Sequence, residues 1–135
     1  MTAQEDVDVY LSKAQESLAS AQSEFANGRY NSCANRCYFA CFQAAVAALV
    51  RGGVVSAGPR AQLGHAYVQA QFAGGLVNRR KQYPGQLRDV LPQLGSLRQT
   101  ADYESVSVTM TRASRALSRA NEFVTTVLSK GGGNL

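Results

Sequence analysis

Apolar residues recur at helical intervals near the start of the chain. Spacings of four and three separate the members of this stripe, which are Val7, Leu11, Ala14, Leu18, Ala21 and Phe25. Such spacing places them all on one face of an amphipathic helix. Asn27-Gly28 comes next, and this pair is typical of a helix end that opens a tight turn. The pattern predicts a first helix that ends there.

A second helix is predicted from about Tyr30 to Val50, with its end at Arg51-Gly52-Gly53. Its core face collects Tyr30, Cys33, Ala34, Cys37, Tyr38, Cys41, Ala44, Ala45 and Ala48. A second stripe, rotated around the helix, collects Ser32, Arg36, Phe39, Ala40, Gln43 and Ala47. We expect the first face to pack in its own bundle and the second to meet something else. Small residues beside an arginine would admit a second helix, as in a symmetric dimer.

The rest of the chain also predicts helices and no sheet. A third helix is expected from near Arg60 towards Gly74-Gly75, and Pro84 is expected to open a shorter one. A last helix is predicted from about Ser105 to Ser129. Four or five helices with short loops indicate an all-α, antiparallel helical bundle. Residues 1–130 would form the single domain, and residues 131–135 a flexible, glycine-rich tail.

Composition and charge narrow the class of protein. Hydrophobic residues make up 45% of the chain and charged residues 17%, as in a soluble globular domain. The acidic N-terminus does not resemble a secretory signal, and the longest apolar run, Ala44 to Val50, is too short to cross a bilayer. We therefore expect a cytoplasmic protein with no membrane contact. The net charge of +5 favours an anionic partner such as RNA, a nucleotide or an acidic protein.

The cysteines do not indicate a metal site or a disulfide framework. Cys33, Cys37 and Cys41 recur every four residues, so they stack along one side of the second helix. A metal site would need a fourth ligand, and the only histidine, His65, is far away in sequence. We interpret the three as small core residues of a reduced protein. No metal or cofactor is expected.

The strongest candidate site is on the second helix. Seven residues are close to two helical turns, so Arg36 and Gln43 lie within about 20° of each other on one face. A guanidinium in such apolar surroundings needs either a protein partner or an anionic ligand. The partner could be a carboxylate from the segment before the last helix, Asp102 or Glu104. Tyr38 lies at the edge of the core face, where its hydroxyl could reach polar groups.

Two basic clusters form a second candidate. Arg112, Arg115 and Arg119 recur at spacings of three and four, which gives a ridge on the last helix. Together with Arg79-Arg80-Lys81, this ridge could follow a phosphate backbone; the alternative is a solvated helix face. No glycine-rich phosphate loop, catalytic carboxylate pair, nucleophile triad or metal cluster is found in the sequence.

Several motifs in order resemble one family. Asn35-Arg36-Cys37-Tyr38-Phe39-Ala40-Cys41-Phe42 is followed by the Gly52-Gly53 break, by Gly64-His65, and by Leu97-Arg98-Gln99-Thr100-Ala101-Asp102-Tyr103. This series, over roughly residues 5 to 128, resembles the HEPN domain proteins, small helical bundles of bacteria and archaea. The resemblance implies a homodimer in which the two second helices meet near a cleft. It also implies a two-component, toxin–antitoxin-type setting with a nucleotidyltransferase-type partner.

Many members of that family are metal-independent ribonucleases with an arginine, a neighbouring polar residue and a histidine. By resemblance, Asn35 and Arg36 match the polar residue and the arginine, while Gln43 occupies the position of the histidine. A histidine can move protons near neutral pH, whereas glutamine can only orient a phosphate or hydroxyl by hydrogen bonding. His65 could replace the missing histidine only if the fold brings it to Arg36.

Three hypotheses follow for function. The first is a binding module that holds RNA or a nucleotide in a cleft around Arg36, with Tyr38 and the arginine ridge as further contacts. The second is an active metal-independent endoribonuclease toxin, in which Arg36 stabilises the scissile phosphate and Asn35 and Gln43 position it. The third is a purely structural dimerisation domain. The residues with a structural or orienting role would be His65, Arg98, Asp102 and Tyr103, and Asp102 would pair with Arg98 or with Arg36 and hold it in a set orientation.

Overall fold

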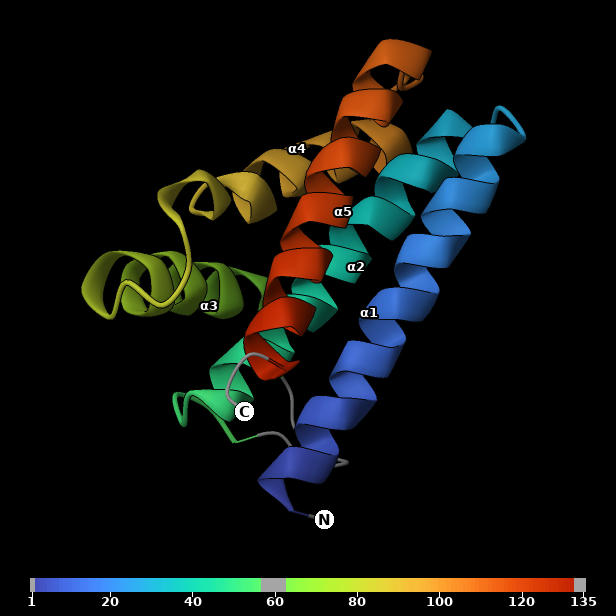
Figure 1. Ribbon diagram of the computed structural model, residues 1–135. Helices are drawn as coiled ribbons and strands as arrows, with labels where there is room; N and C mark the ends of the chain where they lie inside the picture. Colours follow the sequence, from blue (N-terminus) through green and yellow to red (C-terminus); the bar gives the residue numbers. More distant parts are fainter. Residues whose placement is uncertain (1, 57–62, 133–135) are drawn as a thin grey trace.

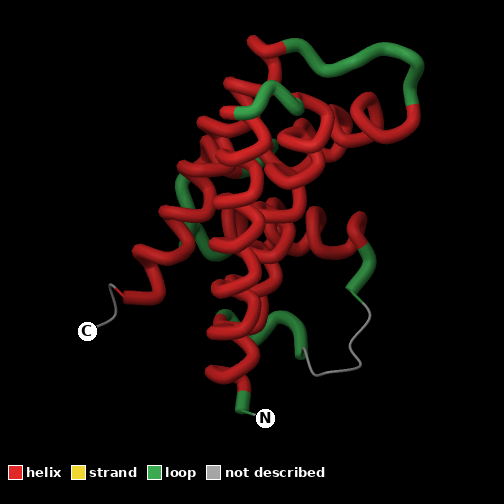
Figure 2. Tube along the Cα trace, turned by 90° about the vertical axis from the view of Figure 1, so that its right-hand side faces the viewer, coloured by secondary structure: helices red, strands yellow, loops and turns green. Residues whose placement is uncertain are grey.

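The computed structural model describes residues 2–56 and 63–132. Within these ranges the protein contains helices and no strand (Figure 2). In chain order the helices are α1 (Ala3–Ala26), α2 (Tyr30–Arg51), α3 (His65–Ala70), a π-helix (Gln71–Arg79), a 3-10 helix (Gly85–Leu87), α4 (Val90–Tyr103) and α5 (Met110–Gly132). The predicted all-α bundle is confirmed.

Helix α2 lies at the centre of the bundle and contacts every other α-helix (Figure 1). Helix α1 runs antiparallel to it along one side. Helix α5 runs in the same direction as α2, and α3 and α4 cross the bundle at one flank. Two contacts fix the parallel pairing: the Val108 amide donates to Asn31 Oδ1 at 2.8 Å, and Arg51 donates to the Val127 carbonyl at 3.1 Å. They lie at opposite ends of α2.

The small side chains of α2 explain how the other helices can pack against it on several sides. Its buried residues include the three predicted core cysteines, all unpaired thiols, and a run of alanines. Small residues let neighbouring helices approach closely while van der Waals contact is kept. The larger core side chains come mainly from the surrounding elements and include Phe72 and Phe123, whose ring centroids are 4.9 Å apart.

The second stripe of α2 is only partly free. Ala40 and Ala47 are completely buried, so this part of the stripe packs inside the protein's own bundle. The expectation that the whole stripe meets an external partner was therefore wrong, because α1 covers more of α2 than the sequence pattern implied. Ser32 remains exposed, and Arg36 and Gln43 are half-buried.

The ends of the first two helices lie where they were predicted. Thr2 Oγ1 accepts a hydrogen bond from the Glu5 amide and so caps the start of α1. Gly28 follows the end of α1 with φ of 73°, a left-handed conformation that glycine adopts without steric cost. Gly53 has the same φ after α2.

The third helix differs from its prediction. Its expected start near Arg60 lies outside the described residues. The helix does not end at Gly74-Gly75 but continues through them to Arg79 as a π-helix. Phe72, Leu76 and Val77 are buried on either side of these glycines, so tertiary packing outweighs a glycine cost of about 1 kcal/mol per residue.

The helix expected to begin at Pro84 begins instead at Val90, because only a 3-10 turn (Gly85–Leu87) follows Pro84, and α4 contains the whole Leu97–Tyr103 motif. Pro92 falls in its first turn, where the missing amide hydrogen has no intrahelical acceptor. Gly95 is needed for close packing, because a Cβ there would lie 3.3 Å from Cε1 of Tyr38.

Helix α5 begins later than predicted. Residues 104–109 form an irregular connection, and Thr109 Oγ1 then accepts from the Arg112 amide as an N-cap. The helix is described to Gly132, so the first glycines of the expected tail continue it. Residues 133–135 lie outside the described residues.

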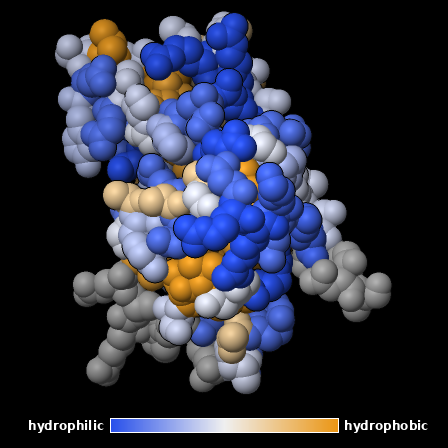
Figure 3. All heavy atoms as spheres, turned by 90° about the vertical axis from the view of Figure 1, so that its left-hand side faces the viewer, coloured by the Kyte–Doolittle hydropathy of each residue, from blue (hydrophilic) through white to orange (hydrophobic). Residues whose placement is uncertain are grey.

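The surface of the bundle is predominantly polar on the side where α3 lies. Figure 3 shows mostly hydrophilic side chains there, with a smaller apolar area in the lower half. Helix α2 is long and apolar enough, by length and composition alone, to cross a membrane. However, 72% of its most apolar window is buried inside the bundle, which is the pattern of a core helix.

Candidate functional site

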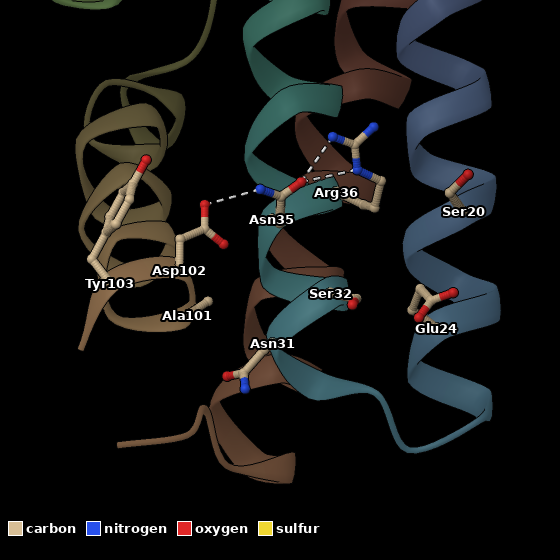
Figure 4. A pocket seen from close by; sticks show the side chains of 9 residues that line it. All are labelled: Ser20, Glu24, Asn31, Ser32, Asn35, Arg36, Ala101, Asp102 and Tyr103. Carbon is tan, nitrogen blue, oxygen red and sulfur yellow. Dashed lines mark hydrogen bonds between the residues drawn. The ribbon is translucent and has the colours of Figure 1, made fainter. Parts of the chain in front are cut away.

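A polar hollow of about 740 Å³ opens between α1, α2 and the end of α4 (Figure 4). This volume is within the range of small-molecule sites. The lining residues come from all three helices and are Ser20, Glu24, Asn31, Ser32, Asn35, Arg36, Ala101, Asp102 and Tyr103. The hollow therefore joins the first and last of the motifs that the sequence analysis had singled out. We call it the Arg36 hollow.

The amide of Asn35 connects the two sides of this hollow. Its Oδ1 accepts from Arg36 Nε at 3.0 Å and from Nη2 at 2.8 Å, while its Nδ2 donates to Asp102 Oδ2 at 3.1 Å. Figure 4 shows Asn35 lying between the other two side chains. The cation on one side and the carboxylate on the other fix the orientation of the amide. Arg36 is also held by the Phe39 ring, whose centroid is 5.2 Å from Cζ.

The charges around the hollow are unequally compensated. Glu24 forms an ion pair with Arg29 at 2.6 Å, and Asp102 pairs with Arg98 at 3.4 Å. Within residues 2–56 and 63–132, Arg36 has no carboxylate within ion-pair distance. The structure thus selects Arg98, and not Arg36, as the partner of Asp102. Among the charged residues that line the hollow, Arg36 is therefore the one without an ion-pair partner within the described residues.

Gln43 faces α1. One terminal atom of its amide lies 3.0 Å from the Lys13 carbonyl oxygen, 2.7 Å from Ser17 Oγ and 3.1 Å from the Phe39 carbonyl oxygen. Because two of these neighbours are carbonyl oxygens, that atom is the amide nitrogen, which donates to them. Gln43 therefore ties α2 to α1. It shares a smaller adjoining hollow of about 310 Å³ with Arg36, so the two side chains are neighbours, as predicted.

Tyr38 and His65 lie outside the Arg36 hollow. Tyr38 is buried, and its hydroxyl lies 2.6 Å from His65 Nδ1 and 3.1 Å from Gln69 Nε2. The amide of Gln69 donates to the hydroxyl oxygen, which leaves the hydroxyl proton for His65 Nδ1. His65 also stacks on Phe42 with ring centroids 4.6 Å apart. The fold thus uses the histidine to attach α3 to α2 and does not bring it into the Arg36 hollow.

The surroundings of this pair shift both pKa values away from neutral-pH chemistry. Burial lowers the pKa of His65, and the positive charge of Arg98 lowers it further. Burial also raises the pKa of Tyr38, against the opposing effects of Gln69 and Arg98. Arg98 lies over the Tyr38 ring, with Cζ 5.1 Å from the ring centroid. It therefore stabilises the closed aromatic cluster and orients Asp102 at the same time.

The arginine ridge occupies a different place. Arg112, Arg115 and Arg119 are exposed and line a hollow of about 170 Å³ between α5 and the first half of α4. This hollow shares no lining residue with the Arg36 hollow. No ion pair within the described residues involves any of the three.

Several lining residues were missed by the sequence reasoning. Ser20 and Glu24 from α1 form the wall opposite Asp102. Tyr103, which the sequence analysis did name, is 72% exposed at the rim. The signal for the α1 residues was present, since Ser17, Ser20 and Glu24 recur at spacings of three and four on a face of α1 that flanks the apolar stripe. What the sequence did not reveal was that this polar face lies beside Arg36.

The site has hydrogen-bonding groups suited to an anion. Its lining includes no histidine, cysteine or lysine, and its titratable side chains other than Arg36 are Glu24, Asp102 and Tyr103. Among the described residues, no group of three histidine, cysteine or acidic side chains is placed to hold a metal ion. Arg36, the free serine hydroxyls and the Asn35 amide are hydrogen-bonding groups suited to a phosphate or a sugar.

Comparison with protein-family models matches residues 7–130 to the HEPN domain. The match spans nearly the whole chain and includes every residue of the Arg36 hollow. The chain belongs to the HEPN family. No curated protein gave a significant match to the chain. In this HEPN protein the order of the motifs has a structural meaning: the Asn35-Arg36 and Leu97–Tyr103 segments meet at one hollow.

Proposed function

We propose that this HEPN protein is a binding module that holds a nucleotide or a short RNA segment in the Arg36 hollow. The observation that carries the proposal is the half-buried Arg36, which has no acidic partner among residues 2–56 and 63–132 and lies in a hollow large enough for a nucleotide. A phosphate would supply the missing negative charge through charge-assisted hydrogen bonds. The membership of a nucleotide- and RNA-related family supports the same conclusion.

Cleavage of RNA by this site alone is disfavoured on chemical grounds. Metal-independent cleavage needs a group that takes or gives a proton near neutral pH. Gln43 cannot do so, and His65 is hydrogen-bonded to Tyr38 outside the Arg36 hollow. The loss of general acid–base help reduces a rate by roughly a hundred- to ten-thousand-fold.

Ligand binding by the purified chain tests the proposal. We expect a mixture of the four nucleoside monophosphates to raise the thermal midpoint of unfolding. At a hundredfold excess over Kd, the ligand should add about 2.7 kcal/mol to the free energy of unfolding. Arg36→Ala should abolish this rise. Arg115→Ala removes the same charge from an exposed position outside the hollow and should keep it. No rise with the wild type, or an equal loss in both variants, would refute the proposal.

The alternative function, a metal-independent ribonuclease, is supported by the Asn35-Arg36 pair and by the proximity of Gln43 to Arg36. Cleavage of mixed cellular RNA in excess EDTA separates it from binding. We expect no cleavage by the wild type. Cleavage that Arg36→Ala abolishes would establish the ribonuclease instead.

The arginine ridge extends the proposal from a nucleotide to RNA. If RNA reaches the ridge, the substitution of Arg112, Arg115 and Arg119 by alanine should lower the slope of log affinity against log salt by about 2 for single-stranded RNA. Mononucleotide binding should not change, because the ridge and the Arg36 hollow share no residue. An unchanged RNA slope would indicate that the ridge is a solvated face.

The proposed biological setting is the one implied by the family resemblance. It consists of a cytoplasmic homodimer that works in a toxin–antitoxin-type pair with a nucleotidyltransferase-type protein. The exposed Ser32 and half-buried Arg36 on α2 support a dimer, because they leave part of this helix accessible beside α1. Sedimentation of the purified chain tests the dimer, and a monomer at micromolar concentration would contradict it.

A further inference from the structure

We propose that a second hollow, formed where α2 and α5 end, binds a phosphate group. Its volume is about 260 Å³, and its lining residues are Ala48, Arg51, Gly52, Gln82, Tyr83 and Lys130. We call it the Arg51 hollow. Figure 1 shows the two helix ends at the same end of the bundle. Arg51 follows Arg36 on α2 by fifteen residues, or roughly 22 Å of helix, so this inference concerns another site and does not rest on the proposed function.

Positive charges converge on this hollow. Arg51 Nη2 donates to Tyr83 Oη at 2.7 Å, and Lys130 Nζ lies 5.6 Å from the centroid of the same tyrosine ring. Arg80 adds a third cation beside them, since its Nη1 donates to the Gly52 carbonyl at 2.7 Å. Within residues 2–56 and 63–132, none of the three has a carboxylate at ion-pair distance. Neighbouring like charges repel, and a bound anion would offset this repulsion.

The charge of Arg51 is held in place without being neutralised. The side chain is half-buried, and its Nη2 bonds only to uncharged oxygens, those of Tyr83 and of the Val127 carbonyl. Its Nη1 is buried and makes no hydrogen bond with the described residues. A partly buried charge costs free energy unless an opposite charge lies nearby. An anion in the hollow would supply that charge to a guanidinium that is already fixed in position.

Tyr83 offers a buried hydrogen-bond donor at the same place. Its oxygen accepts from Arg51, and its own hydroxyl hydrogen has no acceptor among the described residues. The side chain is only 6% exposed. Burial raises the pKa of Tyr83, against the opposing effect of Arg51, so the hydroxyl keeps its proton at neutral pH. A buried donor without an acceptor is unfavourable, and an oxygen of an anion would accept from it.

Helix capping accounts for only part of this arrangement. Basic side chains are common at helix C-termini, where they donate to the last carbonyls. The two arginine bonds to the carbonyls of Gly52 and Val127 have this role. Neither Lys130 nor the Tyr83 hydroxyl donates to a carbonyl of the described residues. Because the two carbonyls are already bonded, the hollow presents donors to a ligand.

The size and charge of the hollow fit a phosphate group. Sites for whole small molecules begin at about 300 Å³, so this hollow suits one phosphate better than a complete nucleotide. A phosphate carries about −1.5 to −2 charges at neutral pH and several acceptor oxygens. It can therefore accept from Lys130 and from Tyr83 together, close to the charge of Arg51. A carboxylate has a single charge and would leave more of the positive charge uncompensated.

Titration of the full chain with inorganic phosphate, at neutral pH and constant ionic strength, tests the inference. Backbone amide signals in NMR spectra report where the ion binds. We expect saturable shifts at Gly52 and Gln82, which line the hollow. The phosphate group has two possible sources, the free ion and the end of a nucleic acid. A short oligoribonucleotide with a 5′-phosphate, compared with its 5′-hydroxyl form, distinguishes them: if the site takes terminal phosphates, only the first form shifts these two amides.

Matched variants assign the binding to its residues. Lys130→Gln should weaken phosphate binding at least about tenfold, because a hydrogen bond from a charged donor is lost. Arg112→Gln removes the same charge from an exposed position of α5 outside the hollow and should keep the affinity. Tyr83→Phe keeps the ring and removes the hydroxyl, so we expect a loss of about fivefold. Lys130→Arg retains the charge and should retain most of the affinity.

The outcomes decide between the two hollows. Saturable shifts at Gly52 and Gln82 that Lys130→Gln weakens, and Arg112→Gln does not, would establish the inference. Absence of such shifts, or equal weakening by both variants, would overturn it. Shifts confined to Asn35 and Arg36 would overturn it as well and would leave the proposed function in place.

Discussion

Arg36 and Tyr38, two polar side chains on α2 with only Cys37 between them, have opposite surroundings. Around Tyr38, the hydroxyl, His65 and Gln69 satisfy one another in a partly buried cluster, in which the Tyr38 side chain is 1% exposed and His65 lies at the surface. Around Arg36, both hydrogen bonds of the guanidinium go to the amide of Asn35, and within the described residues this guanidinium has no acidic partner at ion-pair distance in its hollow. A closed network stabilises the fold, whereas an open one remains available for a ligand. From this difference we expect Tyr38 to affect stability and Arg36 to affect ligand binding.

The largest expected effect on stability comes from the hydrogen-bonded cluster around Tyr38. Tyr38→Ala removes a fully buried ring and the two hydrogen bonds that its hydroxyl makes with His65 and Gln69. We therefore expect a loss of about 3–5 kcal/mol in the free energy of unfolding. Urea denaturation measures it. Tyr67→Ala is the control, since Tyr67 is 48% exposed and should change stability by no more than about 0.5 kcal/mol. Equal losses would show that the cluster around Tyr38 is not a stabilising element.

Gly95→Ala tests the same cluster from α4. The new Cβ would lie 3.3 Å from Cε1 of Tyr38 and 3.6 Å from Gln69 Nε2, so the ring or the helix must shift. Such overpacking costs about 1–3 kcal/mol. Gly74→Ala meets no atom within 4 Å and is expected to be neutral or stabilising in the π-helix. A Gly95→Ala protein as stable as the wild type would refute the close packing of α4 on Tyr38.

Arg36→Ala should have a small effect on stability, which is the counterpart of its large effect on binding. The variant loses one cation–π contact and two hydrogen bonds to Asn35, but within the described residues the substitution leaves no buried carboxylate unpaired. We expect a loss of about 0.5–1 kcal/mol in urea denaturation. A loss of several kcal/mol would instead indicate a structural arginine and would weaken the proposed function.

The smallest expected effect is a pH dependence of stability from His65. Its pKa is lowered in the folded protein, so the unfolded chain takes up a proton more readily. This contribution to stability is fully present above the unfolded pKa of about 6.5 and is lost as the pH falls below it. Thermal midpoints between pH 8 and pH 5 measure the change. His65→Gln should flatten the profile around pH 6, because the chain has one histidine. An unaltered profile would contradict the assignment.

Local sequence patterns predicted most of the helices of the fold. The apolar stripe of α1, the break at Asn27-Gly28 and the extent of α2 follow from helical periodicity and glycine punctuation, and they are confirmed. The errors came where packing outweighed propensity. Gly74 and Gly75 lie inside a helix because buried neighbours hold it, and α5 begins at Met110 because Thr109 caps it.

The candidate site was predictable only in part. Helical spacing by itself placed Arg36 beside Gln43, and the order of the motifs identified the family. Spacing could not show that Gln43 is tied to α1, that His65 bonds to Tyr38, or that Asp102 pairs with Arg98. These contacts join residues far apart in sequence, so only the way α1, α3 and α4 cross α2 could decide them. The sequence determined which faces of the helices are polar, and the tertiary structure decided which of those faces meet and which charge they leave uncompensated.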